Sequence, residues 1–207
     1  MDIEKYKEIS QEVDARLADI VDEFTYAINA LKNDSRVVRT RLLIAFSLLE
    51  VVCNLFNAFF NLGLGNRALL EKWLNDFCLN DMNRTFKAHP YLRMITPAHM
   101  YKFRNAIVHT LGLPEPENGI SITVPNGTET AEIIKKMDEG FKSLGHKVAF
   151  ISADELTKLF LDGYAMMHLA IFKNPATAVQ SDLDGLVRIL SEFNRRGARP
   201  VPLVKPQ

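Results

Sequence analysis

The chain has 207 residues, of which 47% are hydrophobic and 24% charged, and its 25 basic and 25 acidic side chains leave no formal net charge. This balance is ordinary for a globular protein of one domain with at most an appendage. It excludes a highly basic protein that coats nucleic acid, an acidic disordered chain and a low-complexity chain. A local basic groove remains compatible with it.

The first half of the chain has the pattern of long helices. Apolar side chains recur every three or four positions between residues 2 and 32, which predicts an amphipathic helix. Residues 36–62 are apolar on nearly every face, so we expect a central helix that Ser35 caps and two glycines end. Asn66 is expected to cap a third helix, and helical character weakens across residues 80–95.

The next helix has a strong start signal. Thr96 can cap it, and Pro97 suits the first helical position, so we expect a helix to about Leu111. Segments 120–124 and 146–152 then alternate like strands on either side of a helical segment, 128–144. These two segments are expected to pair as a small β-ribbon with that helix inserted between them.

The last third of the chain returns to helix. Ser152 or Asp154 caps a helix to about Phe172, and a final helix spans residues 183–195. The fold class is therefore mostly α, a helical bundle with a small β-ribbon insertion. Residues 1–175 are expected to form the bundle, including an α/β insertion at 113–152. Residues 176–207 are expected to form a C-terminal helix and an extended or mobile proline-containing tail.

Cysteine usage and hydropathy favour a cytoplasmic protein with no membrane partner. Cys53 and Cys78 lie in apolar contexts without a CxxC partner, which is typical of buried reduced thiols. The polar start of the chain lacks the apolar core of a signal peptide. The apolar stretch 42–62 carries Glu50 and three asparagines, which are too many polar groups for a membrane span.

The segment that bears chemistry is Phe103–His109. At about 100° per residue, a helix places Met100, Phe103, Ile107 and Leu111 on one face, which we assign to the core. Asn105 and His109 are an i, i+4 pair on another face, and Arg104 lies at the margin. A guanidinium can hold a phosphate through two hydrogen bonds, and an imidazole can exchange protons near neutral pH. The set suits phosphodiester chemistry without a metal.

These side chains also have ordinary structural interpretations. A histidine at the end of a helix often interacts only with the last carbonyl groups. An arginine at the margin of a core is commonly a surface ion-pair partner. The helix geometry alone leaves both alternatives open.

Arg-Asn-x-x-x-His on an apolar helix resembles the Arg-x4–6-His motif of the HEPN superfamily. The resemblance implies an α-helical bundle and, in many members, a metal-independent endoribonuclease whose active site forms at a dimer interface. The family's arginine matches Arg104, the polar residue that often follows it matches Asn105, and its histidine matches His109. Members often carry an acidic residue on an earlier core helix, and Glu50 is the candidate here. A carboxylate in so apolar a helix needs a partner, and Arg104 would be a suitable one.

The motif spacing also occurs at Arg84…His89 and Arg93…His99, but neither pair lies on one continuous apolar helix. One departure from the family affects regulation. Members that a partner nucleotidyltransferase silences carry a tyrosine two residues after the histidine, where this chain has Leu111. We therefore do not expect neutralisation by adenylylation at that position.

Other candidate sites are weaker. The remaining histidines have no metal-ligand spacing, so we expect no metal and no cofactor. Basic clusters open the second predicted helix and precede the tail, and such clusters are usually solvated faces. If RNA binds, the candidate contacts are Arg39, Arg41 and Lys102.

We therefore expect a homodimeric, metal-independent endoribonuclease of the HEPN type in a toxin, defence or stress-response role. RNA would be its substrate, and an antitoxin or regulatory protein would be a partner. Arg104, Asn105, His109 and Glu50 are the candidate catalytic residues. The alternative from another class is a non-catalytic interaction module that binds a protein, a nucleotide or RNA. A third interpretation is a structural protein in which Arg104 and Glu50 form only a buried ion pair.

Overall fold

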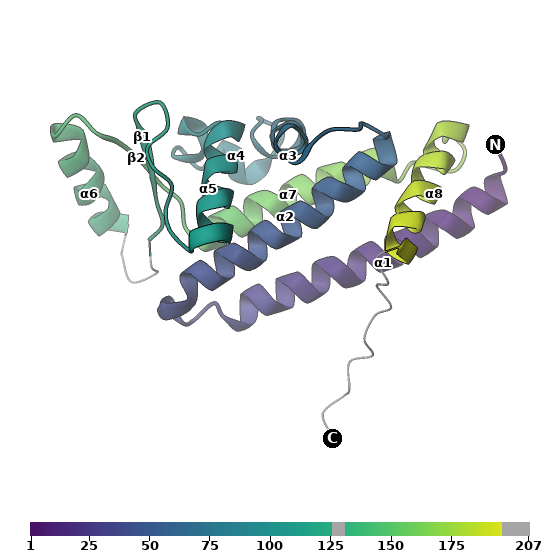
Figure 1. Cartoon of the computed structure of the whole chain (residues 1–207), viewed down its shortest axis with the longest axis horizontal. Helices are drawn as coiled ribbons and strands as arrows, with labels where there is room; N and C mark the ends of the chain where they lie inside the picture. The colour runs from purple at the N-terminus through teal and green to yellow at the C-terminus, as the bar shows by residue number, and fades with distance from the viewer. Residues whose placement is uncertain (126–130, 196–207) are drawn as a thin grey trace, which may run out of the picture.

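The computed structural model describes residues 1–125 and 131–195, which form eight α-helices and one two-stranded parallel sheet (Figure 1). The prediction of a mostly helical protein is confirmed. The proline-containing tail, with Arg196 and Arg199, and the predicted helix start at Thr128 lie outside the described residues.

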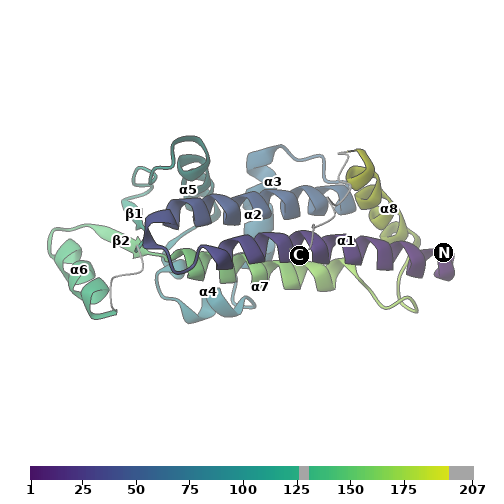
Figure 2. The same ribbon diagram turned by 90° about the horizontal axis from the view of Figure 1, so that it is seen from below.

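Three long helices run along the length of the molecule, α1 (Ile3–Ala30), α2 (Val38–Phe60) and α7 (Ala153–Ile171) (Figures 1 and 2). The helix α8 (Gln180–Arg195), which the sequence sets apart as a C-terminal segment, packs against α1 and α2 at one end. Arg188 of α8 donates hydrogen bonds to the carbonyl oxygens of Ala58 and Phe59 at the end of α2, at 2.8 and 2.6 Å. These bonds use carbonyl groups that a helix end otherwise leaves without partners.

Shorter elements pack against α2 and α7. They are α3 (Asn66–Trp73), continued by a π-helical turn η2 (Leu74–Cys78), α4 (Arg84–Ala88), a 3₁₀ turn η3 (Leu92–Met94) and α5 (Pro97–Thr110). Of these, α3 and α5 are in contact with α2, and η2 and α4 are in contact with α7. Helix α5 contacts both α2 and α3, so the predicted motif helix lies directly against the central helix.

The helix α2 is the core of the bundle, as its apolar composition predicts. Phe46 is completely buried, with its ring centroid 5.3 Å from that of Phe103 in α5 and 5.6 Å from that of Phe160 in α7. Among the described residues, Ser35–Phe60 is the one helical stretch with the length and hydropathy of a membrane span. In this fold α2 contacts α1, α3, α5, α7 and α8, so its apolar surface is used in packing.

Two predicted caps are wrong by one residue. Asp34, and not Ser35, accepts a hydrogen bond from the Arg36 N–H and starts a 3₁₀ turn, η1 (Ser35–Val37), before α2. Gly65 is the cap position of α3, and Asn66 is the first helical residue. The Asn66 side chain therefore does not act as the cap of α3.

The β-ribbon is confirmed as a parallel pair. Strand β1 (Ile120–Thr123) pairs with β2 (Lys147–Phe150) in the register Ile120 to Lys147, and α6 (Ala131–Ser143) lies between them in the chain. Parallel strands need such a crossover. The unit lies at the end of the molecule away from α8 (Figure 1).

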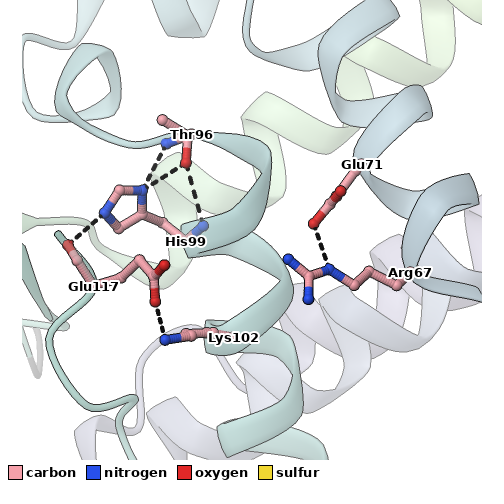
Figure 3. Close-up of polar contacts among 6 residues, drawn as sticks. All are labelled: Arg67, Glu71, Thr96, His99, Lys102 and Glu117. Carbon is pink, nitrogen blue, oxygen red and sulfur yellow. Dashed lines mark hydrogen bonds and ion pairs between the residues drawn. The ribbon is translucent and has the colours of Figure 1, made fainter.

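The first turn of α5 is tied to the segment that follows the helix (Figure 3). The Thr96 N–H donates to His99 Nδ1 at 3.1 Å, and His99 Nε2 lies 2.8 Å from the Glu117 carbonyl oxygen. Since the Glu117 carbonyl can only accept, Nε2 carries a proton. Since Nδ1 accepts from the Thr96 N–H, it carries none, and the imidazole is neutral. The Glu117 carboxylate forms an ion pair with Lys102, one turn further along α5.

Gly163 of α7 sits where two elements approach too closely for a side chain. A Cβ there would lie 2.6 Å from Cys78 Sγ and 2.9 Å from Trp73 Cη2. We expect Gly163→Ala to lower the free energy of unfolding by about 1–3 kcal/mol through overpacking. Urea denaturation measures the change. Gly140→Ala in α6 is the matched control, because its Cβ would meet nothing within 4 Å; an equal loss in both variants would contradict the packing explanation.

The neutral imidazole of His99 makes stability depend on pH. Burial, and secondarily Lys102, lower the pKa of His99. The unfolded chain then binds the proton more readily, so stability falls as pH drops below about 6.5, the ordinary histidine value. One proton gives a slope of at most about 1.4 kcal/mol per pH unit. His99→Gln can accept the same bond from Thr96 without titrating. Denaturation at pH 7.5 and 5.5 should show that this variant loses less stability on acidification than the wild type does. Equal losses of stability would contradict the role of His99.

Candidate functional site

Helix α5 presents two different faces, as its sequence predicts. Met100, Phe103 and Ile107 are completely buried against the core. Leu111, expected on the same face, is instead exposed, because the helix ends at Thr110 and Leu111 adopts a left-handed conformation with φ 51°. Its N–H and that of Gly112 donate to the carbonyl oxygens of Ile107 and Ala106, which closes the helix in a Schellman-type cap.

The other face of α5 opens onto a pocket of about 360 Å³ between α2, α3 and α5. All four residues predicted as catalytic line it. We call this cavity the motif pocket, and its lining residues are Glu50, Cys53, Asn54, Asn66, Leu69, Leu70, Tyr101, Arg104, Asn105 and His109. A pocket of this size with several convergent polar groups is the usual form of a small-ligand or active site.

Arg104 is held from two sides. Its Nη2 forms an ion pair with Glu50, and its Nη1 donates a 2.8 Å hydrogen bond to Asn105 Oδ1. The pairing of Arg104 with Glu50 that we expected is therefore present. The Arg104 side chain is 17% exposed and that of Glu50 39% exposed. The guanidinium is thus fixed at the wall of the pocket while part of it still faces the opening.

The surroundings of the pocket set the charge states of two groups. Burial lowers the pKa of Arg104, although a guanidinium remains charged at neutral pH in any protein environment. Burial also raises the pKa of the Cys53 thiol well above its ordinary value. Since the thiolate is the nucleophile, Cys53 contributes an apolar wall and not a reactive group.

His109 lies on the last turn of α5 and is exposed. Within the described part of the chain, no hydrogen bond or ion pair engages its imidazole. Both ring nitrogens are thus available to a ligand. Hydrogen-bond reach to the reacting group is the first requirement for a general acid or base.

The sequence analysis did not assign six lining residues of the motif pocket to a site, and three of these six, Asn54, Asn66 and Tyr101, carry an amide or a phenol group. Tyr101 and Asn54 could have been found from helical spacing, because Tyr101 precedes Asn105 by one turn and Asn54 follows Glu50 by one turn. Asn66 comes from α3, and no pattern in the sequence places the start of α3 beside α5.

The three residues predicted to contact RNA lie in different environments. Arg41 is not a surface residue, because its side chain is buried and forms an ion pair with Asp154 of α7. We therefore withdraw Arg41 as an RNA contact. Lys102 is bound to Glu117 and does not line the motif pocket. Arg39 is exposed and lines a separate pocket at the start of α2.

The remaining histidines are engaged elsewhere or lie apart. His89 contacts Glu155 at 3.0 Å, and His168 contacts Asp14 at 2.7 Å. The two other Arg…His spacings are not on one helix: Arg84 begins α4 and His89 follows its end, and Arg93 and His99 lie in η3 and α5. Across residues 1–125 and 131–195, His, Cys, Asp and Glu form no group of three that could hold a metal ion.

Comparison with known proteins adds no relative to this description. No family model, curated protein or solved structure matches the chain. The resemblance to the HEPN superfamily consequently rests on the motif residues of the sequence alone.

The ion pair between Glu50 and Arg104 should show as a coupling energy. We expect the double-mutant cycle of Glu50→Gln and Arg104→Gln to give a coupling energy of about 1 kcal/mol. This energy is larger than that of an exposed ion pair and smaller than that of a fully buried one, because Glu50 is partly exposed. Denaturation of the four proteins measures it. The exposed pair Arg67–Glu71 is the control and should give about 0.5 kcal/mol or less; equal couplings in the two cycles would contradict the expectation.

Proposed function

We propose that the protein is a metal-independent endoribonuclease of the HEPN type. One observation carries the proposal: Arg104, Asn105 and His109 converge on one open pocket, and Glu50 contacts the arginine from the neighbouring helix. A fixed cation and an unengaged imidazole on one wall can supply charge stabilisation and one of the proton transfers that phosphodiester cleavage needs in the absence of a metal.

In this reaction the ribose 2′-hydroxyl attacks the adjacent phosphorus and the 5′-oxygen leaves, which produces a 2′,3′-cyclic phosphate and a 5′-hydroxyl. His109 would take the proton from the 2′-hydroxyl or give one to the leaving oxygen. Arg104 would bind the phosphate and stabilise its charge in the transition state. Asn105 and Glu50 would position the guanidinium through the contacts they make with it.

Each chain supplies one motif imidazole, whereas cleavage involves two proton transfers. The homodimer that the resemblance implies would bring a second His109 to the same cleft. This arrangement is part of the proposal.

A second function has an observation in its favour. Arg104 is the one Lys or Arg among the described residues that line the motif pocket, and Glu50 neutralises it. A nearly neutral pocket also suits a non-catalytic module that binds an uncharged ligand. Cleavage by the wild type that the variants below lose favours the nuclease, whereas a binding module cleaves RNA in neither the wild-type nor the variant form.

We expect His109→Ala to reduce cleavage of single-stranded RNA by about 100-fold or more, which is the usual contribution of a general acid or base. Arg104→Lys keeps the charge but loses the two-bond contact with phosphate, and a similar loss is expected. His109 is exposed, so its replacement should leave the fold intact. Gel analysis with end-labelled RNA measures the rate, and denaturation checks the fold.

The matched control is His146→Ala, an exposed histidine outside the pocket, which should cleave like the wild type. The product should carry a 2′,3′-cyclic phosphate, and a chelator should leave the rate unchanged. A product with a 5′-phosphate, or a rate that a chelator abolishes, would refute attack by the 2′-hydroxyl without a metal. A wild-type protein that does not cleave RNA would refute the nuclease and favour the binding module.

A further inference from the structure

Beyond the motif, the pocket contains a second group of polar and aromatic side chains from three helices. Asn54 comes from α2, Asn66 is the first residue of α3, and Tyr101 lies on α5 one turn before Asn105. The same cavity therefore extends from Arg104 and His109 to two carboxamides and a phenol ring.

Asn54 is partly buried and Asn66 is exposed, and neither carboxamide has a structural role that the described residues reveal. Within residues 1–125 and 131–195, neither the Asn54 nor the Asn66 side chain makes a hydrogen bond. Asn83 shows how the same fold uses a structural asparagine: it donates to the carbonyl oxygens of Phe77 and Leu159 and accepts from the Phe86 N–H. A carboxamide offers two donors and two acceptor sites, so this pair in a pocket can read a ligand edge that carries both.

Tyr101 supplies a flat surface beside the carboxamides. Its ring is partly buried, and the Arg67 guanidinium lies over it with its carbon 5.3 Å from the ring centroid. Arg67 is itself held by Glu71 at 2.8 Å (Figure 3). The ring therefore has a fixed neighbour, and aromatic rings fixed in this way are stacking surfaces for bases in single-stranded nucleic acid.

The absence of charged side chains at this end of the pocket limits the class of ligand that can bind there. Asn54, Asn66 and Tyr101 are neutral, and Cys53, Leu69 and Leu70 complete the wall with buried apolar side chains. None of these described lining residues is a cation, and the nearby Arg67 lines a different pocket and is paired with Glu71. A flat, uncharged group with a hydrogen-bonding edge matches the chemistry, and nucleobases have that form.

We propose that this end of the motif pocket is a nucleobase subsite. It would bind the base of the nucleoside whose 2′-hydroxyl attacks, with Asn54 and Asn66 reading the base edge and Tyr101 stacking on its face. The proposal rests on the nuclease function for the identity of the ligand. It adds that cleavage depends on which base precedes the scissile phosphate. The cavity of about 360 Å³ lies within the range of small-ligand sites, roughly 300–1,000 Å³.

Binding of the four nucleoside 3′-monophosphates to the full chain tests the subsite without requiring cleavage. These probes place a base next to a 3′-phosphate, as in the cleavage product, and differ only in the base. We expect calorimetry to show one base or one base class bound at least about tenfold more tightly than the rest. The double variant Asn54→Ala/Asn66→Ala should lose that preference. Asn75→Ala, an exposed asparagine outside the motif pocket, is the control and should retain it.

Tyr101 is tested by a pair of variants. Tyr101→Phe keeps the ring and should bind like the wild type. Tyr101→Leu loses the stacking surface and should weaken all four probes by about tenfold. Denaturation of each variant confirms that it is folded before binding is compared.

Cleavage of RNAs that differ at a single position separates failure of the subsite from failure of the nuclease. Cleavage with a base preference that the asparagine variants abolish supports both proposals. Cleavage without a preference, or with a preference that the variants retain, overturns the subsite and leaves the nuclease standing. Base-selective binding that the double asparagine variant loses, without cleavage of RNA by the wild type, supports the subsite and overturns the nuclease. Absence of both binding and cleavage overturns both.

Discussion

The packing of Phe103 against Phe46 determines where the candidate site can form. Both rings are completely buried and meet edge to face, which fixes the point at which α5 crosses α2. Glu50 follows Phe46 by one helical turn, and Arg104 is the neighbour of Phe103 in the chain. The contact between the two rings therefore brings the Glu50 carboxylate and the Arg104 guanidinium close enough to form their ion pair. The same crossing leaves a hollow that α3 completes.

The chemistry of the pocket depends on how Arg104 is held. An arginine that is free in water must give up side-chain freedom before it can bind a phosphate, whereas this one is already restrained by Glu50 and Asn105. The restraint also neutralises the charge, so under the proposed function the long-range attraction of RNA would have to come from elsewhere on the molecule. Arg39 is the one candidate contact that remains exposed and outside an ion pair among the described residues.

Helical periodicity was sufficient for most of the fold. The central position of α2, the buried face of α5 and the strand pair with its intervening helix all follow from local patterns. The pairing of Glu50 with Arg104 could be anticipated because a lone carboxylate in an apolar helix requires a partner. Asn66 and the burial of Arg41 could not, because both depend on how helices distant in sequence are placed. Periodicity shows which face of a helix is apolar. It does not show which other helix packs over the edge of that face.

The contact between His99 and Glu117 has a consequence for the motif helix as a whole. Final turns of helices commonly fray, and an imidazole on such a turn would spend part of its time misplaced. Here the chain that leaves the final turn of α5 returns to the first turn through a closed ring of residues 99–117, and Leu111 and Gly112 seal the end of the helix. The chain that leaves the last turn of α5, next to His109, is therefore held at Glu117 by the first turn of the same helix, and only the short loop 111–116 lies between the two points.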